Sequence, residues 1–406
     1  MIVGRLELTD FRNYARAELD LDRGVTIVVG PNGQGKTNLV EAIGYLATGG
    51  SHRVSSDQAL VRAGESAAIV RATLRHGGRE VLMECQINRS GANRLLVNRN
   101  PVRSREAKRY IDSVLFAPED LAIVRGEPSG RRRLLDALMV ATAPRMAAIL
   151  ADYERVLRQR TALLKSARAT RVPADALGTL DIWDERLAAL GAEIVVARAA
   201  LVHDLAPLAA AAYQRIAGTE QRVELRMRTT VDGVDPEEDP GAPVLVDRDP
   251  VATDTVPPDT VPTAAETVAA ETVATVAARL TARIAQVRRA ELDRAVTLVG
   301  PHRDDLSIEL NGLPARGYAS HGESWSLALS LRLASAELLR ATGAAGDPVV
   351  ILDDVFAELD ERRRDRLMAA VADFEQVIIT AAVPSDVPEI AGSRTITIRA
   401  GAIVDD

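Results

Sequence analysis

Apolar and polar residues alternate at both ends of the chain, and this period of two predicts β-strands. Residues 1–8 alternate in this way, and so do residues 66–100, where Gly-containing turns divide the pattern into antiparallel hairpins. Other runs are almost entirely apolar, which is typical of strands covered on both faces. These apolar runs are residues 25–29, 349–352 and 377–380, and residues 297–299 also have strand character.

The middle of the chain carries apolar residues at helical spacing instead. Long helices between two strand-rich ends predict an α-helical arm inserted into a discontinuous α/β domain. We therefore expect the α/β domain at residues 1–130 and 295–406, and the helical arm at residues 131–294. The arm helices are predicted at about residues 131–166, 180–216 and 263–294.

Composition adds that the chain is an ordinary globular protein. Its 406 residues are 47% hydrophobic and 26% charged, which suggests two or three soluble domains. No run of eighteen apolar residues occurs, so we expect no membrane span. Cys85 is the only cysteine, which excludes an intrachain disulfide and fits a reducing cytoplasm.

The formal net charge of −7 argues against nucleic acid until its distribution is considered. Residues 232–260 contain nine acids and one arginine, so this stretch accounts for the whole negative excess. It is rich in proline and almost free of large apolar groups, so it cannot bury enough surface to offset the entropy of ordering. We expect a disordered acidic insertion at about residues 232–262.

A basic segment in the first lobe is a candidate DNA surface. Residues 89–109 carry seven lysines and arginines against Glu106 alone. Aromatic residues are only 3% of the chain, which favours contacts with the backbone of duplex DNA over base stacking. The alternative is a solvated face in an arginine-rich protein. The candidate contacts are Arg94, Arg99, Arg103 and Arg105.

The strongest chemical motif is Gly30-Pro31-Asn32-Gly33-Gln34-Gly35-Lys36-Thr37, which matches G-x-x-x-x-G-K-[ST]. It follows a predicted strand and opens a predicted helix, as a phosphate-binding loop requires. Backbone N–H groups of such a loop surround phosphate oxygens, the lysine reaches the β- and γ-phosphates, and the threonine ligates Mg²⁺. We therefore expect ATP and Mg²⁺ to bind here. The nucleotide contacts would come from Gly30, Pro31, Asn32, Gly33, Gln34, Gly35, Lys36, Thr37 and Asn38.

An acidic pair supplies the second half of an ATP site. Val349-Val350-Ile351-Leu352 is followed by Asp353 and Asp354, which places two carboxylates at the carboxyl edge of the predicted sheet. Asp353 and Thr37 would hold Mg²⁺. Asp354 would polarise the attacking water, and Lys36 would be the second catalytic residue.

The distance between these two motifs resembles that of ABC-type ATPases with helical arms. The arm fills much of the gap between Lys36 and Asp353. Ser320-His321-Gly322-Glu323 resembles the signature loop of that group, with the second Gly and the Gln replaced. Further segments are similar to those of the RecF family of recombination mediators. These segments are residues 10–14, 30–38, 51–53, 116–121, 131–136, 300–305 and 352–360.

The resemblance implies an α/β fold with an ABC-type P-loop ATPase lobe and an inserted α-helical arm. It implies a homodimer in which ATP lies between two protomers, with Ser320 and Gly322 of one protomer against the γ-phosphate held by the other. It further implies a weak DNA-stimulated ATPase that binds double-stranded and gapped DNA in repair, replication and the SOS response. RecR-type and RecO-type mediators and the recombinase would be its partners, and Arg12 would touch the nucleotide.

Other classes of P-loop protein remain as alternatives. A membrane transporter's ATPase subunit shares the fold, but the long arm and the altered signature loop argue against it. A structural chromosome organiser would need heptads over hundreds of residues, whereas each helical stretch here is at most roughly 35 residues, or about 50 Å. A P-loop kinase needs no acidic pair so far downstream.

Overall fold

The computed structural model describes residues 1–54, 56–170, 178–233, 272–343, 345–399 and 401–404, and within these ranges the side chains of residues 104, 105, 108 and 178 are left out. The chain divides into two compact units. The first comprises residues 1–121, 208–220 and 325–406, and the second comprises residues 122–207 and 221–324. The expected division into an ATPase head at 1–130 and 295–406 and an arm at 131–294 stays a prediction.

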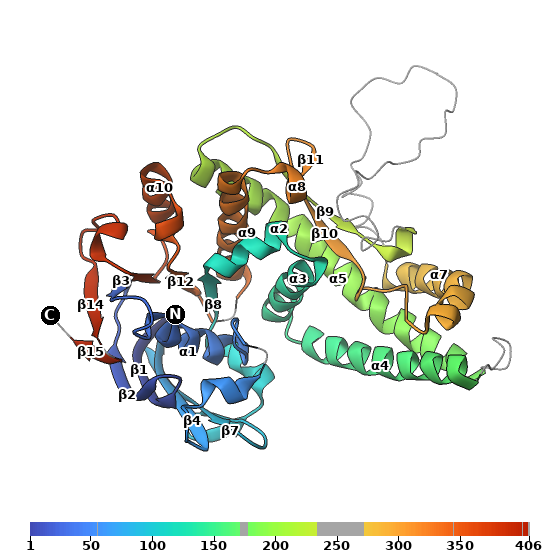
Figure 1. The fold of residues 1–406 in the computed structure, drawn as a ribbon, viewed down its shortest axis with the longest axis horizontal. Coiled ribbons are helices and arrows are strands. Elements are labelled where there is room, and N and C mark those ends of the chain that lie inside the picture. Colours follow the sequence, from blue (N-terminus) through green and yellow to red (C-terminus); the bar gives the residue numbers. More distant parts are fainter. Residues whose placement is uncertain (55, 171–177, 234–271, 344, 400, 405–406) are drawn as a thin grey trace. The chain divides into compact units, whose positions relative to one another are not determined.

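The first unit contains an antiparallel sheet built from the alternating N-terminal segments (Figure 1). Buried residues alternate with more exposed ones along its longer strands, strictly so from Ala67 to Leu74. The strand order is β2-β1-β4-β5-β6-β7. The strands are β1 (Ile2–Phe11), β2 (Tyr14–Asp20), β4 (Ala67–His76), β5 (Arg79–Asn88), β6 (Arg94–Val97) and β7 (Asn100–Val102).

The second sheet of this unit is mainly parallel and has the order β15-β14-β3-β13-β12-β8. Five of its strands run parallel and only β15 is antiparallel. Its central strands are buried throughout, as expected for continuous apolar runs. The strands are β3 (Gly24–Val29), β8 (Ser113–Phe116), β12 (Val349–Asp353), β13 (Gln376–Ala381), β14 (Arg394–Arg399) and β15 (Ala402–Val404).

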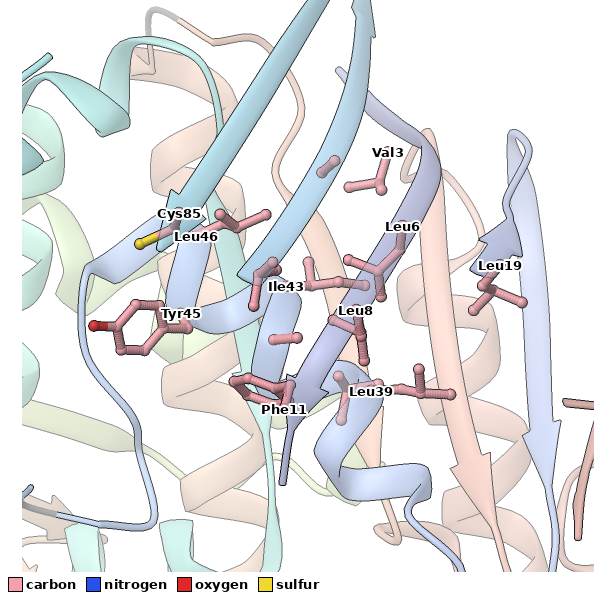
Figure 2. Close-up of a cluster of buried hydrophobic side chains, with 14 of the residues drawn as sticks. Val3, Leu6, Leu8, Phe11, Leu19, Leu39, Ile43, Tyr45, Leu46 and Cys85 are labelled. Atoms are coloured by element: carbon pink, nitrogen blue, oxygen red, sulfur yellow. The ribbon is translucent and has the colours of Figure 1, made fainter. Parts of the chain in front are cut away.

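Helix α1 (Lys36–Thr48) joins the two sheets into one core. It packs on β1 and β4 of the antiparallel sheet and on β8, β12 and β13 of the parallel sheet. Figure 2 shows Leu39 and Ile43 of α1 in one buried cluster with Leu6 and Leu8 of β1. This packing fixes the start of α1, which follows directly from the phosphate-binding loop. The unit also contains most of α9 (His321–Thr342) and α10 (Glu361–Val371).

The second unit is mostly helical. The helix expected at 131–166 is in fact two, because Pro144 cannot continue an α-helix and disfavours helical geometry at the residue before it. A small antiparallel sheet of β9 (Val223–Arg228), β10 (Asp305–Leu310) and β11 (Leu313–Pro314) accompanies them. The helices are α2 (Leu121–Arg125), α3 (Pro128–Thr142), α4 (Met146–Thr170), α5 (Gly178–Ala217), α7 (Val273–Arg294) and α8 (Ala315–Tyr318), and α5 continues into the first unit.

The strand expected at residues 297–299 is wrong, because these residues form no strand and lead into a turn at residues 301–303. The Thr297 carbonyl accepts bonds from the His302 ring and from Arg303, at 3.2 Å and 3.0 Å. Tyr153 of α4 contacts His302 at 2.7 Å, and the buried carboxylate of Asp304 accepts the Thr230 N–H at 2.8 Å. Side chains therefore hold this segment where a strand would need backbone partners.

Buried ion pairs tie the second unit together. Arg160 of α4 is fully buried and bonds Asp184 of α5 at 2.6 Å and Glu291 of α7 at 2.5 Å. Arg131 of α3 forms a two-pronged pair with Asp305 of β10, at 2.7 Å and 2.8 Å. Removing one partner would leave an uncompensated buried charge, which is strongly destabilising.

Helix α5 bears on the expected absence of a membrane span. Residues 179–217 of α5 are long and apolar enough to cross a membrane, a test that the core helix of a soluble protein also passes.

Asp232, where the expected acidic insertion begins, lies in the 3-10 turn η5 (Thr230–Asp232) and pairs with Arg279. Residues 234–271, which include the rest of that insertion, lie outside the described residues.

Candidate nucleotide-binding site

The phosphate-binding loop lies where β3 ends and α1 begins, as the motif predicts. Gly33 and Gly35 adopt left-handed backbone angles, with φ of 80° and 111°. At Gly35 a side chain would also collide with Asn13 and Tyr14, because its Cβ would lie 2.6 Å from the Asn13 amide nitrogen and 2.7 Å from the Tyr14 hydroxyl. Glycine is therefore required at Gly35 both by conformation and by space.

Lys36 is buried in this loop, with 3% of its surface exposed. Its ammonium donates to the Gly30 carbonyl at 2.8 Å and approaches the Pro31 carbonyl and the Asn32 side-chain oxygen at 3.4 Å each. The loop's own oxygens thus satisfy the charge. An incoming phosphate carries a full negative charge and would bind the same ammonium more strongly than these neutral acceptors do.

Two asparagines brace the loop from outside it. Asn13, which follows β1, donates to the Gln34 carbonyl at 3.2 Å and accepts from the Asn38 side chain at 2.8 Å. Asn38 accepts in turn from Arg53 at 3.1 Å. Asn38, an expected nucleotide contact, therefore holds the loop in this structure. Sequence reasoning assigned no role to Asn13, although it lies in the segment 10–14 that carried the family resemblance.

The acidic pair meets the loop at the carboxyl edge of the parallel sheet. Asp353 ends β12, and its carboxylate accepts from the Thr37 hydroxyl at 3.2 Å and from the Thr380 hydroxyl at 2.5 Å. Burial raises the pKa of Asp353 to about 6, a rise that the bond from Thr380 opposes and the nearby Asp354 increases. Residues that lie far apart in the sequence, Thr37 and Asp353, are thus brought into direct contact.

This pair of oxygens suits Mg²⁺. A cation between Thr37 and Asp353 would supply a positive charge to balance the buried carboxylate. Mg²⁺ usually takes one or two protein ligands, and phosphates and water complete its coordination shell. The described residues hold no group of three or more His, Cys, Asp and Glu side chains arranged for a metal.

Asp354 has an unusual backbone for its residue type. Its φ is 51°, in the left-handed region that non-glycine residues seldom occupy. Its N–H donates to the Thr380 hydroxyl at 3.0 Å, and the residue is only partly buried. The turn therefore separates the two acids, with Asp353 fixed in the sheet and Asp354 at its edge.

Arg12 is engaged by a partner that sequence reasoning did not find. Its guanidinium forms a two-pronged bond with the fully buried Glu41 of α1, at 2.9 Å and 2.6 Å, and also donates to the Ala59 carbonyl at 3.0 Å. Burial opposes ionisation of Glu41, but the bonds from Arg12 and Ser51 outweigh it and lower the pKa of that carboxyl. A contact between Arg12 and the nucleotide stays a prediction.

The segment that resembles a signature loop forms a helix cap. The Ser320 hydroxyl accepts the Glu323 N–H at 3.3 Å, and the Glu323 carboxylate accepts the Ser320 N–H at 2.8 Å. This reciprocal pair is a capping box at the start of α9. Gln221 also donates to Glu323 at 2.9 Å. The Glu that departs from the family pattern therefore holds Ser320 in place.

The candidate DNA-contacting arginines lie on the antiparallel sheet of the first unit. Arg94 begins β6, Arg99 occupies the β6–β7 turn and Arg103 follows β7, and all three are exposed. No carboxylate among the described residues pairs with these three, whereas Arg89 is bound to the carbonyls of Val61, Arg62 and Glu65. The side chain of Arg105 lies outside the described residues.

Sequence relatives align with this chain along its whole length. Residues 2–400 match the family described as RecF/RecN/SMC N terminal domain. The chain is 57% identical over 408 residues to the DNA replication and repair protein RecF of Clavibacter michiganensis subsp. michiganensis, covering 100% of this chain and 96% of that protein. It is 54% identical to RecF of Leifsonia xyli subsp. xyli over 405 residues, with 100% of both chains covered.

Solved structures agree with these sequence matches. A structure of the recombination mediator protein RecF with ATP, in the RecFOR pathway, has a TM-score of 0.80 and 27% identity, covering 99% of this chain and 98% of that one. An SMC head bound to a domain of ScpA shares the fold at a TM-score of 0.51 and 14% identity, covering 99% of this chain and 96% of that one. Family match, full-length identity and fold lead to the same conclusion. The chain belongs to the RecF family of DNA replication and repair proteins.

Proposed function

We propose that this chain is an ATP-dependent DNA-binding protein of recombinational repair and replication-fork maintenance, acting in the cytoplasm. The observation that carries the proposal is the contact between Thr37 and Asp353, which joins a phosphate-binding loop to an acidic pair in one ATP site. RecF relatives named for DNA replication and repair match the whole chain, and a RecF relative was solved with ATP.

In this proposal each residue of the site has a separate role. Lys36 exchanges the Gly30 carbonyl for the β- and γ-phosphates, and the loop N–H groups bind the remaining phosphate oxygens. Thr37 and Asp353 would hold Mg²⁺, which neutralises phosphate charge when bound. Asp354 orients the attacking water, so turnover depends on it more than binding does. Hydrolysis is slow and acts as a switch.

We infer that ATP also joins two protomers. The Ser320 hydroxyl accepts a bond from Glu323, so its own proton remains available to donate to a phosphate oxygen. Gly322 follows in the first turn of α9, where backbone N–H groups favour anions. Ser320 and Gly322 of one protomer would bind the γ-phosphate held by its partner. The nucleotide would then favour the dimer because it interacts fully only in that state.

DNA would bind through the exposed arginines of the antiparallel sheet. Arg94, Arg99 and Arg103 have no acidic partner among the described residues, so they can neutralise phosphates without breaking an ion pair. Such contacts are insensitive to sequence and suit recognition of duplex and gapped DNA. A related RecF structure is that of a recombination mediator in the RecFOR pathway, which supports RecR-type and RecO-type mediators and recombinase loading as the setting.

Duplex-DNA binding tests the proposal directly. Fluorescence anisotropy would be measured with ATP, with ADP and without nucleotide, at two salt concentrations, for the wild type and for Asp354→Asn. We expect tight binding only with ATP, weaker at high salt, and Asp354→Asn to remain dimeric with ATP while hydrolysing it slowly. Nucleotide-independent DNA binding would contradict the ATP switch. A monomeric Asp354→Asn protein with ATP would contradict the sandwiched dimer.

A further inference from the structure

Thr380 lies between the two halves of the ATP site. It is the fifth residue of β13, the strand that separates β3 from β12, and its side chain is fully buried. Across the parallel sheet it is level with Val28 of β3 on one side and with Asp353 of β12 on the other. The strand on one side leads into the phosphate-binding loop, and the strand on the other ends in the acidic pair.

The Thr380 hydroxyl contacts both acids through different groups. It donates to the Asp353 carboxylate at 2.5 Å, and it accepts the backbone N–H of Asp354 at 3.0 Å. A hydroxyl has one proton and two lone pairs, and an ionised carboxylate and an N–H fix which way each bond runs. One small group therefore orients the carboxylate of one acid and the backbone of the next.

The second of these bonds holds a strained turn. Asp354 has a φ of 51°, which only the surrounding structure can maintain in a residue other than glycine. The bond from its N–H to Thr380 is a direct constraint on that conformation. Downstream of Thr380 the chain continues as Ala381-Ala382-Val383, so Thr380 provides the last hydrogen-bonding side chain of β13. The loop is joined to the same strand, because the Gly30 N–H donates to the Ala381 carbonyl at 3.3 Å.

We propose that Thr380 is a positioning residue for the ATP site, which sets the Asp353 carboxylate for Mg²⁺ and the Asp354 carboxylate for the attacking water. This inference rests on the proposed function, since it requires that ATP and Mg²⁺ bind here. Thr380 touches neither the nucleotide nor the reacting atoms and acts through the two acids. Thr37, by contrast, would be a direct ligand.

A purely structural role for Thr380 is the competing explanation, because a buried hydroxyl also satisfies buried polar groups. The two roles differ in what they predict for Mg²⁺. A structural residue changes thermal stability and leaves the response to Mg²⁺ alone. A positioning residue changes how much Mg²⁺ strengthens ATP binding, and that quantity can be measured without turnover.

The test compares Thr380→Val with Thr380→Ser, which removes and keeps the hydroxyl respectively. Affinity for a fluorescent ATP analogue would be measured with Mg²⁺ and with a chelator, together with ATP turnover and melting temperature. Hydrogen bonds to charged groups are strong, so losing the one from Thr380 should have a measurable effect. In Thr380→Val, we expect the factor by which Mg²⁺ strengthens ATP binding to fall about tenfold, and kcat to fall at least about tenfold. Thr380→Ser should stay within about twofold of the wild type in both.

Thr26→Val is the matched control. Thr26 is a buried threonine of β3 in the same sheet and has no bond to either acid. It should change melting temperature without changing the Mg²⁺ response. If Thr380→Val does not fold, Thr380→Cys carries the test, because a thiol fills the site but is a weak donor.

The outcomes separate this inference from the function on which it rests. A wild-type protein whose ATP affinity is unaffected by Mg²⁺ would overturn the proposed ATP site itself. If Mg²⁺ strengthens ATP binding equally in the wild type and in Thr380→Val, and kcat is also unchanged, the positioning role is overturned. The proposed ATP site is then unaffected.

Discussion

At the scale of single residues, the proposed binding of the ATP phosphates depends most directly on Lys36. Its ammonium is buried and surrounded by oxygens of its own loop. Those oxygens would be left without a donor if the side chain were removed, and the phosphates of ATP would lose their cation. Both consequences are local, because the loop is braced separately by Asn13.

We expect Lys36→Ala to weaken ATP binding by about 100-fold or more, since truncating one partner of a buried charged contact is costly. Isothermal titration calorimetry with ATP and Mg²⁺ measures this. Lys165→Ala is the control, because Lys165 is an exposed lysine on α4. ATP affinity unchanged in Lys36→Ala would show that the phosphates bind elsewhere.

The sequence predicted the residues of the site whose signal is local. The phosphate-binding loop and the acidic pair follow from short motifs beside apolar strands. Glu41 and Thr380 could not be predicted, because their roles depend on partners brought close only by the fold. Glu41 in a helix suggests an exposed acid until Arg12 is found bonded to it. Thr380 follows three apolar residues of β13, and nothing in this sequence indicates that Asp353 lies beside it.

At the scale of elements, the segment before β10 contains two ionisable groups, Asp304 and His302, whose pKa values are shifted in opposite directions. Burial raises the pKa of Asp304 to about 6 and lowers the pKa of His302 to about 4. The raised pKa of Asp304 means that its folded form holds a proton more tightly, so its contribution to stability falls as pH rises from about 4 through about 6. The contribution of His302 is present above pH 6.5 and is lost as pH falls toward 4.

We therefore expect Asp304→Asn to gain melting temperature relative to the wild type as pH rises from 4.5 to 7, because the penalty of a buried charge is removed. Differential scanning fluorimetry across this range measures the difference. Arg198 lowers the pKa of Asp304 and Asp232 raises it, so both remain unchanged in the comparison. His302→Asn should show the opposite trend. A difference that does not vary with pH would mean that the pKa of Asp304 is the same in the folded and the unfolded protein.

Element types were predictable where apolar periodicity was strong, and boundaries were not. The strands that carry the ATP site were found because each is a continuous apolar run. The break between α3 and α4 was missed because the period continues through it, while Pro144 stops the hydrogen bonding. Residues 297–299 resemble a strand in composition, but polar side chains supply the bonds that a neighbouring strand would have supplied.

At the scale of the whole molecule, charge distribution matters more than net charge. The exposed arginines of the antiparallel sheet have no acidic partner among the described residues, although the chain as a whole carries −7. We expect the combined substitution of Arg94, Arg99 and Arg103 by Glu to weaken duplex binding for all sequences alike. The slope of affinity against salt should fall by about one for each DNA phosphate that the variant no longer neutralises.

Anisotropy titrations at several salt concentrations measure that slope. The matched control reverses three exposed arginines of α4, namely Arg155, Arg158 and Arg168, and so changes net charge equally. Equal loss of binding in both triple variants would mean that overall charge, and no particular surface, governs the interaction. The acidic segment at 232–262 was predicted from composition, and most of it lies outside the described residues.

The buried Arg160 has a consequence for how the second unit opens. Its bonds reach Asp184 and Glu291, so the helices α4, α5 and α7 meet at one charged centre. Moving any one helix away would strand charges in the interior, which makes separate fraying of a single helix costly. Backbone amides around this centre should therefore exchange their hydrogens with solvent together, as one cooperative unit.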